Sequence, residues 1–362
     1  GERVGQGYHD HSGAPHAEVM ALRDAGPQAV GATVYVNLEP CCHFGKTPPC
    51  VEEIIRCGVR EVFSCGADPD PRVNGRGFQA LRRAGIRVTV GLLEEESSRL
   101  NESFSKFVRT RIPFLTVKGA LSLDGKIATA RGDSTWISGR ESRLRVQELR
   151  YETDCIMVGL ETLRKDDPRL TLRRPGGGQK KLTRVIVDSR LRVPTSARIF
   201  GTLSQGPIHI YTTRKGTAAA IRKLEQVGAR VIPVRSKGGR VSLPAVLEDL
   251  GARGLTSVLL EGGGEVIGSA FREGLVDKVI LFMAPRIIGG RDAPGLLMGD
   301  GFSPLDACPR IRNLRIDRIG EDIYLEGYPE TVAAVAERRA QEKKPETGTS
   351  ARYAPGPPRQ EI

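Results

Sequence analysis

The sequence lacks the features that would place the protein in a membrane or in a secreted, disulfide-bonded class. None of its apolar runs approaches the length of a membrane-spanning helix. The seven cysteines follow no framework of regular spacings, and no signal-peptide pattern is present. We therefore expect a cytoplasmic protein, kept under reducing conditions, whose 362 residues are enough for two domains.

The sequence also lacks a block of Lys and Arg, or a basic stripe interleaved with aromatic residues, which nucleic-acid binding usually shows. The formal net charge is +12, and the excess lies in residues 111–330, with 36 Lys+Arg against 25 Asp+Glu. A diffuse basic region suits phosphorylated small molecules as well as nucleic acid. We expect no nucleic-acid and no membrane partner, and keep a nucleic-acid-binding zinc module as an alternative hypothesis.

Strand and helix patterns alternate along most of the chain, which predicts α/β architecture. In residues 1–110 the expected helices are Ala17–Ala25, a helix after Cys50 and one near Gly77–Ala84, and the expected strands are Thr33–Leu38, Glu61–Ser64 and Arg87–Val90. After a break near Leu100–Pro113, residues 111–330 give a second series of strands, with helices expected near Ala218–Val227, Pro244–Arg253 and Val266–Glu273 and short antiparallel runs in Ile311–Tyr328. The tail, residues 331–362, is rich in Pro, Glu and Lys and is predicted to be disordered.

A zinc site is indicated by His16 and by Cys41 and Cys50, which lie in the loop sequence EPCCHFGKTPPC at Glu39–Cys50. Three protein ligands leave one zinc position open, where bound water loses a proton near neutral pH. Glu18 lies two residues from His16, as the acid/base of a hydrolytic zinc deaminase does. We predict that His16, Cys41 and Cys50 bind one Zn²⁺ and that Glu18 transfers protons.

The spacing of the two cysteines departs from the P-C-x-x-C pattern of zinc deaminases, because the second follows the first by nine positions. Cys42 and His43 also lie in this loop and compete for the same two places. A closed structural zinc knuckle, or a set of unrelated buried cysteines, is the alternative. Because a structural site has no use for a carboxylate beside its histidine, Glu18 favours the catalytic interpretation.

Three segments of the second region suggest ligand binding. Ser257–Phe271 has the pattern of a strand, a glycine turn and a helix, whose backbone amides can approach a phosphate; an ordinary glycine turn fits equally well, and the G-x-G-x-x-G spacing is absent. Ser122–Ser138 surrounds the single tryptophan, and Thr162–Arg174 combines paired aspartates with several arginines. These segments can hold a planar ring and a phosphate, or they can be a buried tryptophan and a solvated charged loop.

Several motifs occur in one order along the chain: HAE, EPCCHFGKTPPC, GRGFQALRRAGI, LDGKIA, GDSTWIS, DDPRLT, VDS, LEGGG and APRIIGG. From His9 to Gly327 the chain resembles the bifunctional pyrimidine deaminase/reductase family of riboflavin biosynthesis. The resemblance implies a cytidine-deaminase-like α/β/α sandwich in residues 1–110. It further implies a dihydrofolate-reductase-like α/β domain in residues 111–330.

The family's first activity is zinc-dependent hydrolytic deamination of 2,5-diamino-6-(5-phosphoribosylamino)pyrimidin-4(3H)-one. Its second activity is the NADPH-dependent reduction of the ribosyl group of 5-amino-6-(5-phosphoribosylamino)uracil to ribityl. The resemblance therefore implies Zn²⁺ and NADPH as cofactors and phosphoribosylaminopyrimidines as substrates. We also expect a homo-oligomer.

The resemblance assigns residues to both sites. For the deaminase it repeats His16, Cys41, Cys50 and Glu18 and adds the substrate contacts His9, His43, Lys46 and Asp68. For NADPH it implies Ala120, Trp136, Thr162, Asp166, Ser189 and the turn Gly262, Gly263, Gly264, Glu265, Val266, Ile267, Gly268 and Ser269. For the reductase substrate it implies Ser134, Arg150, Leu170, Arg173 and Glu261, with Lys126 and Asp166 as two candidate acids for the reduction.

The chain departs from the family pattern at three places. The usual first helix and strand, with a P-N-P-x-V-G segment whose Asn holds the pyrimidine, is absent from the opening GERVGQGYH. Asp70 stands where Asn is more frequent, and Cys42 stands where Ser is usual and is expected not to bind the metal. The first departure raises an alternative function, a reductase whose deaminase domain is impaired.

Overall fold

The computed structural model describes residues 1–11, 13–173, 180–213, 217–331 and 334–335. Nearly all of the tail that was predicted to be disordered lies outside these residues, as does Arg174. Within the described residues, no helix is long and apolar enough to cross a membrane. The chain forms two compact units, Gly1–Leu115 with Glu148–Leu259 and Thr116–Gln147 with Leu260–Ile362.

A three-stranded parallel sheet lies at the centre of the N-terminal region, in the order β1-β2-β3. Its strands are β1 (Thr33–Val36), β2 (Glu61–Ser64) and β3 (Arg87–Val90). The rings of Tyr35 and Phe63, paired in register on neighbouring strands, stack with centroids 5.1 Å apart. The predicted strands are confirmed, except that the first ends at Val36 and not at Leu38.

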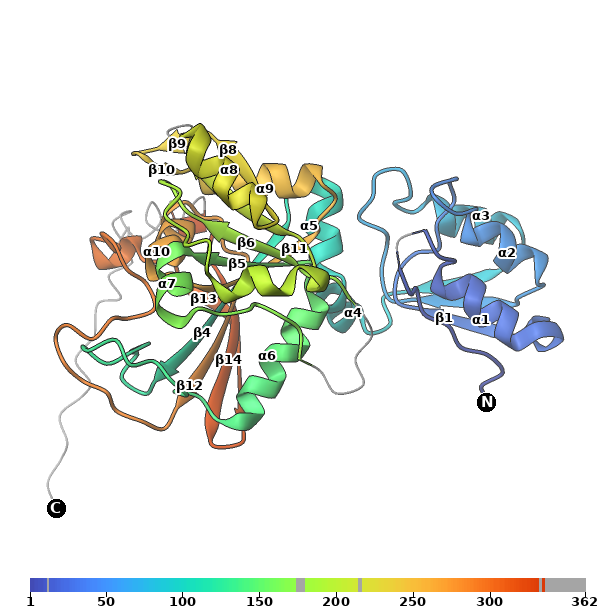
Figure 1. Cartoon of the computed structure of the whole chain (residues 1–362). Helices are drawn as coiled ribbons and strands as arrows, with labels where there is room; N and C mark the ends of the chain where they lie inside the picture. Colours follow the sequence, from blue (N-terminus) through green and yellow to red (C-terminus); the bar gives the residue numbers. More distant parts are fainter. Residues whose placement is uncertain (12, 174–179, 214–216, 332–333, 336–362) are drawn as a thin grey trace, which may run out of the picture. The chain divides into compact units, whose positions relative to one another are not determined.

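Helices α1 (Ala17–Ala25), α2 (Cys50–Arg56) and α3 (Arg76–Arg83) pack with this sheet (Figure 1). Their apolar residues at helical spacing supply the core, in which Leu22, Ile54, Val62 and Leu81 are buried. The helices confirm the α/β prediction for this region. Two further helices, α4 (Glu94–Leu100) and α5 (Glu102–Thr110), follow the sheet.

A nine-stranded sheet is formed by the rest of the chain, in the order β13-β14-β12-β4-β11-β5-β6-β7-β8. Strands β5 to β8 belong to the first compact unit and β12 to β14 to the second. The bounds are β4 (Phe114–Ser122), β5 (Cys155–Gly159), β6 (Thr183–Val187), β7 (Ile208–Thr213), β8 (Ala229–Val234), β11 (Ser257–Gly262), β12 (Lys278–Ala284), β13 (Ile311–Ile319) and β14 (Asp322–Pro329).

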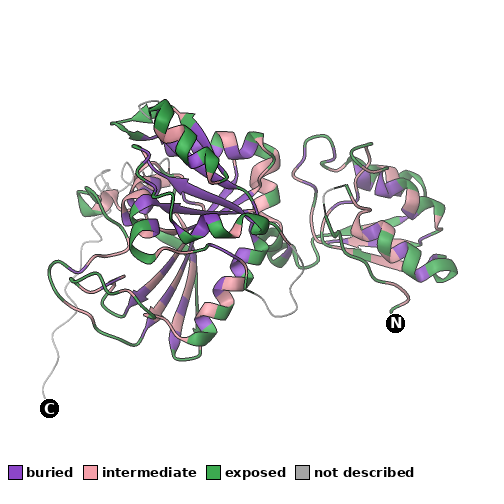
Figure 2. Cartoon of the chain, in the orientation of Figure 1, coloured by how far each residue is buried: buried purple, intermediate pink, exposed green. Residues whose placement is uncertain are grey.

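The burial of the strands follows their place in the sheet (Figure 2). β5, β6 and β7 are buried along their whole length, and they are parallel and rich in Val and Ile, as strands covered on both faces are. β13 lies at the edge and is largely exposed. β13 and β14 pair antiparallel, which confirms the prediction for Ile311–Tyr328.

The helices of this region are α6 (Arg140–Glu152), α7 (Leu160–Asp166), α8 (Ala218–Gln226), α9 (Leu243–Ala252) and α10 (Gly264–Arg272). A two-stranded hairpin, β9 (Ser236–Lys237) with β10 (Arg240–Val241), and the 3₁₀ segments η1 (Gly26–Ala29), η2 (Arg198–Gln205) and η3 (Leu305–Ala307) complete the regular structure. The sequence pattern indicated α8, α9 and α10 but missed α6 and α7. Both missed helices are dominated by charged residues and carry few apolar positions.

Candidate functional site

His16, Cys41 and Cys50 come together, with one potential ligand atom from each and all three atoms within 4.8 Å of one another. The Cys41 Sγ atom lies 3.5 Å from His16 Nδ1, and the Cys50 Sγ atom lies 3.2 Å from the same nitrogen. This is the one such group of three or more metal-ligand side chains among the residues that the structure describes. One imidazole and two thiols at this spacing fit the three protein ligands of a catalytic zinc ion.

Two helix N-termini and one loop position the three ligands. His16 is the residue before α1, and Cys50 is the first residue of α2, after Pro49. Proline before a helix start favours this arrangement because its fixed φ suits the turn. Cys41 is held from its backbone, since Val51 N–H donates to its carbonyl at 3.2 Å. The Thr47 hydroxyl lies 3.3 Å from His16 Nε2 and orients the ring.

The thiols of the site have perturbed acidity. Hydrogen bonds from Cys50 and then from His16 lower the pKa of Cys41 to about 4, and the backbone N–H of Cys50 also donates to its sulfur at 3.3 Å. The pKa of Cys50 is raised, because it donates to Cys41 and is buried. A thiolate is the form that binds a metal, and the lowered pKa of Cys41 favours that form.

Glu18 lies in the first turn of α1 and is buried, with 9% of its surface exposed. Burial is the main cause of its raised pKa, and a hydrogen bond with Cys50 opposes the shift. A carboxyl group whose pKa is moved toward neutrality can both accept and donate a proton. The predicted acid/base residue therefore lies in contact with a predicted zinc ligand.

The four residues predicted to contact the deaminase substrate lie in different surroundings. The His9 ring meets the His16 ring edge to face, with centroids 5.2 Å apart, and Lys46 lies exposed in the loop before Cys50. The Nδ1 atom of His43 is buried without a hydrogen-bond partner among the described residues. Burial raises the pKa of Asp68 to about 6. His9 is thus close to a zinc ligand.

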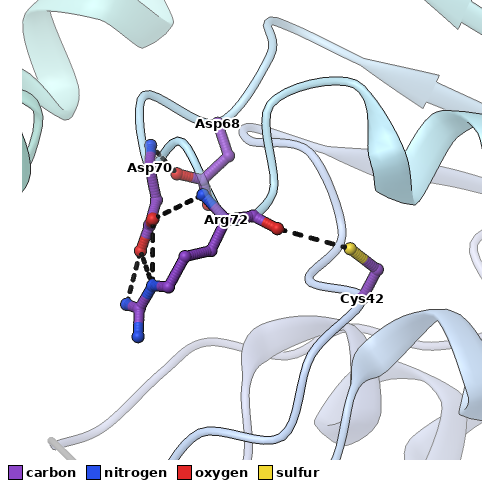
Figure 3. A network of polar contacts seen from close by, with 4 residues as sticks. All are labelled: Cys42, Asp68, Asp70 and Arg72. Atoms are coloured by element: carbon purple, nitrogen blue, oxygen red, sulfur yellow. Dashed lines mark hydrogen bonds and ion pairs between the residues drawn. The ribbon is translucent and has the colours of Figure 1, made fainter.

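The loop after β2 ties Asp68 to Asp70 and Arg72 (Figure 3). Asp68 accepts a hydrogen bond from the backbone N–H of Asp70 at 2.8 Å, and the Asp70 carboxylate pairs with the Arg72 guanidinium. Arg72 holds the pKa of Asp70 at about 2. The sequence left the role of Asp70 open; in the structure its carboxylate binds Arg72 within the loop after β2.

Cys42 does not belong to the group of metal ligands. Its thiol points to the Arg72 carbonyl, with the sulfur 4.0 Å from the oxygen (Figure 3), and its side chain packs against the core of the N-terminal region. Cys57 packs against the same core, and Cys155 is fully buried, while Cys65 and Cys308 are half-buried. All seven cysteines are free thiols.

Glu39 is a functional candidate that the sequence analysis missed. It is buried, with 3% of its surface exposed, and its two carboxylate oxygens accept from four backbone N–H groups, those of Asp68, Gly75, Gly77 and Phe78. The signal was present in the sequence, because an acidic residue directly precedes the Pro40 and Cys41 of the zinc loop. Its partners lie 29 to 39 residues away, so no local pattern reveals them.

The glycine turn predicted to bind a nucleotide joins β11 to α10. Gly263 has φ +88°, a conformation that favours glycine, and precedes the first helical residue. A Cβ at Gly264 would lie 2.6 Å from the Met298 side chain, and one at Gly268 would lie 2.0 Å from the Met298 carbonyl oxygen. Close packing of the Met298 segment thus accounts for both of these glycines.

Four further residues predicted to bind NADPH lie in strands of the nine-stranded sheet or in the segments that directly follow them. Ala120 lies in β4, Thr162 and Asp166 lie in α7 after β5, and Ser189 follows β6. The Ser189 hydroxyl accepts from the Val241 N–H at 3.1 Å. Ligands of open α/β sheets bind at the carboxyl ends of the strands, which is where Thr162 and Ser189 lie.

Trp136 corrects one of the alternatives from the sequence, since it is not buried: 61% of its surface is exposed. Its backbone has φ +59°, unusual for a bulky residue. The Arg143 guanidinium lies 4.3 Å from the centroid of the indole ring, and it donates to the Ser138 carbonyl at 2.6 Å. An exposed indole held in this way can stack on a planar group.

The residues predicted to bind the reductase substrate differ in exposure. Leu170 is buried and has φ +50°, while Arg173 is exposed. Arg150, in α6, is buried and donates to the Thr171 carbonyl at 3.1 Å. Ser134 lies before Trp136 and Glu261 in β11, and both are half-buried.

The two candidate acids also differ in their surroundings. Lys126 donates from Nζ to the Ala293 carbonyl at 3.0 Å, so the LDGKIA segment is bonded to the APRIIGG segment and its continuation. Asp124 strengthens this link by accepting from the N–H groups of Ile288 and Gly289. Asp166 is exposed at the end of α7.

The N-terminal region and the nine-stranded sheet together define a two-part enzyme: a zinc-dependent deaminase followed by a dihydrofolate-reductase-like reductase. The zinc-binding region of cytidine and deoxycytidylate deaminases matches residues 1–65, and the RibD C-terminal domain matches residues 113–325. The chain belongs to the RibD family of bifunctional riboflavin-biosynthesis deaminase/reductases.

Relatives of known name and structure support this membership. The chain is 40% identical to riboflavin biosynthesis protein RibD of Aquifex aeolicus, over 90% of this chain and 88% of that protein. It is 37% identical to RibD of Escherichia coli, over 90% and 89%. Acinetobacter baumannii RibD, form 1, matches with a TM-score of 0.78 and 34% identity over 91% and 89%.

A Thermotoga maritima structure, described as a diaminohydroxyphosphoribosylaminopyrimidine deaminase/5-amino-6-(5-phosphoribosylamino)uracil reductase, matches with a TM-score of 0.74. Its identity is 32%, over 90% of this chain and 88% of that chain. The zinc ligands therefore belong to an enzyme domain and not to a nucleic-acid-binding module.

Proposed function

We propose that this chain deaminates 2,5-diamino-6-(5-phosphoribosylamino)pyrimidin-4(3H)-one and then reduces the ribosyl group of 5-amino-6-(5-phosphoribosylamino)uracil to ribityl with NADPH. The observation that carries the proposal is the meeting of His16, Cys41 and Cys50 beside the buried Glu18. A structural zinc site needs no buried carboxyl group in contact with its ligands. A hydrolytic zinc site does need such a carboxyl group, because protons must be transferred there.

Glu18 moves the protons of the deamination. His16, Cys41 and Cys50 would hold a zinc ion, which would lower the pKa of the attacking water. Glu18 takes a proton from this water as oxygen adds to C2 of the pyrimidine, and returns it to the 2-amino group as the C–N bond breaks. Water and the amino group thus yield the carbonyl and ammonia.

The substrate contacts of the deaminase are proposed from their chemistry. His9, His43 and Lys46 can donate to the phosphate, and the Asp68 carboxylate can accept from ring or amino N–H groups. The buried Nδ1 of His43, which has no partner among the described residues, supports a role in ligand binding.

The reductase residues are proposed on the same basis. NADPH contacts come from Ala120, Trp136, Thr162, Asp166, Ser189 and residues 262–269, and substrate contacts from Ser134, Arg150, Leu170, Arg173 and Glu261. NADPH held by these residues would supply hydride to the sugar carbon, and an acid of the protein would supply a proton to the ring oxygen as the sugar opens. Lys126 and Asp166 are the two candidates for this acid.

We further propose that the deaminase domain comprises residues 1–110 and the reductase domain residues 111–330, that the enzyme is a homo-oligomer and that it works in the cytoplasm. The matches to residues 1–65 and 113–325 support the division. Seven free thiols support a reducing compartment.

Ammonia release from the diamino substrate tests the proposal. Zinc-loaded protein is expected to release ammonia, and protein stripped by a chelator is expected to lose this activity and regain it on addition of Zn²⁺. NADPH oxidation with the uracil substrate serves as the control, since it requires no zinc. Zinc-loaded protein that oxidises NADPH but releases no ammonia would instead establish the reductase-only alternative.

A further inference from the structure

We infer that Glu39 is a positioning residue of the deaminase: its buried carboxylate fixes the loop that carries Asp68 against the zinc loop that carries Cys41. This inference rests on the proposed function of Asp68 as a substrate contact. It assigns to Glu39 no contact with the zinc ion, the water or the substrate.

The contacts of Glu39 divide between its two oxygens. Oε2 accepts from the N–H of Asp68 at 3.1 Å and of Gly75 at 2.7 Å. Oε1 accepts from the N–H of Gly77 at 2.8 Å and of Phe78 at 3.3 Å. A single carboxylate therefore holds both ends of the segment from Asp68 to Phe78.

Glu39 also caps the N-terminus of α3, where the residue at the N-cap position provides no side chain. The residue before this helix is Gly75, whose φ is +87° and which has no side chain to bond the first-turn N–H groups. The N–H groups of Gly77 and Phe78 lie in that first turn, and the Glu39 carboxylate accepts both. A negative charge at a helix N-terminus is stabilising, so this cap binds α3 to the zinc loop.

The packing leaves little freedom at this junction. A Cβ at Gly77 would lie 2.2 Å from the Pro40 carbonyl oxygen and 3.0 Å from Glu39 Oε1. Close approach of α3 to the zinc loop thus requires glycine at position 77. The segment of residues 68–78 meets the zinc loop a second time, before α3 begins, where the Cys42 thiol points to the Arg72 carbonyl (Figure 3).

The consequence for function follows from the position of Glu39 in the chain. Only Pro40 separates Glu39 from Cys41, and the Asp68 backbone is bonded directly to the Glu39 carboxylate. The Glu39 side chain therefore sets the distance between the zinc ligand Cys41 and the proposed substrate acceptor Asp68. Misplacement of a binding group by about 1 Å can cost up to about 100-fold in kcat/KM.

The test is a Glu39→Gln variant, which keeps the shape but can accept at only one oxygen, so that its amide NH₂ faces two backbone N–H donors. We expect the KM for the diamino substrate to rise by about tenfold or more, with a smaller change in kcat, because substrate placement is affected and proton transfer is not. Zinc content and NADPH oxidation on the uracil substrate are expected to stay at wild-type values and report that the chain is folded.

Two further variants separate this role from a general effect of losing a buried carboxylate. Gly77→Ala leaves Glu39 intact but forces α3 away from Pro40, and is expected to raise the same KM. Asp188→Asn removes a comparable buried carboxylate, which accepts from the N–H groups of Arg190, Arg192 and Val193, and is expected to leave the deaminase KM unchanged.

Hydrogen–deuterium exchange of peptides covering residues 66–78 gives a readout that needs no turnover. The inference requires faster exchange in Glu39→Gln than in the wild type, together with the raised KM. Unchanged exchange, an unchanged KM despite faster exchange, or loss of zinc together with deamination would each overturn it. A wild-type chain that releases no ammonia would overturn the proposed function instead, and the exchange comparison would still decide whether Glu39 holds the loop.

Discussion

At the scale of single residues, the three cysteines of the zinc loop do not all lie in the metal site. Cys50 lies with His16 and Cys41 in the predicted zinc site, whereas Cys42, one residue after Cys41, turns toward the Arg72 carbonyl. The sequence offered four candidate ligands for two places in this loop. The backbone determines which of the candidates lies in the zinc site, because Cys50 is the first residue of α2 and its thiol is directed to the same side as His16.

Replacement of these cysteines tests the assignment. Cys50→Ser is expected to lower bound zinc from about one ion per chain to well below it, since catalytic zinc takes three protein ligands and a serine hydroxyl is a poor substitute for a thiolate. Cys42→Ser is the matched control and is expected to keep its zinc. Metal analysis of the purified variants gives the measurement, and equal zinc loss in both would contradict the assignment.

The pKa of Asp68 predicts a pH dependence of deamination. Burial raises this pKa to about 6, and the ionised form, which predominates above that value, is the one that accepts N–H donors. Deaminase kcat/KM is therefore expected to fall as pH drops below about 6. In Asp68→Asn the activity should be lower and this inflection absent; an unchanged inflection would assign it to another group.

Sequence reasoning reached the site residues whose chemistry is local and missed those whose partners are distant. His16 and Glu18 have the H-x-E spacing, Cys41 and Cys50 lie in one proline-flanked loop, and the structure brings the three ligands together. Glu39 could not be found in this way, because its four partners lie between Asp68 and Phe78 and depend on how the loops meet.

At the scale of elements, the predicted strands and most helices agree with the structure, while α6, like α7, was missed. Its sequence RESRLRVQELRYE has few apolar positions, so the helical period is weak. Its start is fixed from far along the chain, where the buried Asp322 of β14 accepts from the Gly139 N–H at 2.7 Å and the Ser142 hydroxyl at 2.5 Å. Such a cap can be recognised only in the fold.

Removal of this cap is expected to destabilise the reductase. Asp322→Ala leaves the Gly139 N–H and the Ser142 hydroxyl without their acceptor, and we expect a loss of about 2 kcal/mol in the free energy of unfolding. Urea denaturation followed by NADPH oxidation gives the measurement. Glu321→Ala, at the exposed neighbouring position, is the control and should change the midpoint little; an equal shift in both variants would contradict the role of Asp322.

At the scale of the whole molecule, one chain carries two chemistries that need different cofactors. In the proposed mechanism the deaminase part uses the zinc ligands and Glu18, and the reductase part uses the nine-stranded sheet and its loops. Each activity therefore serves as an internal control for variants of the other. The family motifs allowed both to be predicted from the sequence, because they occur in one order over nearly the whole chain.

We propose that deamination by the first part supplies the substrate that the second part reduces. The most direct measurement follows ammonia and NADPH together when the wild type and Glu18→Gln receive the diamino compound. The wild type should release one ammonia for each NADPH oxidised, with ammonia appearing first. Glu18→Gln should keep its zinc, lose both signals by about 100-fold or more, and still oxidise NADPH with the uracil compound. Full NADPH oxidation from the diamino compound without ammonia would contradict the account.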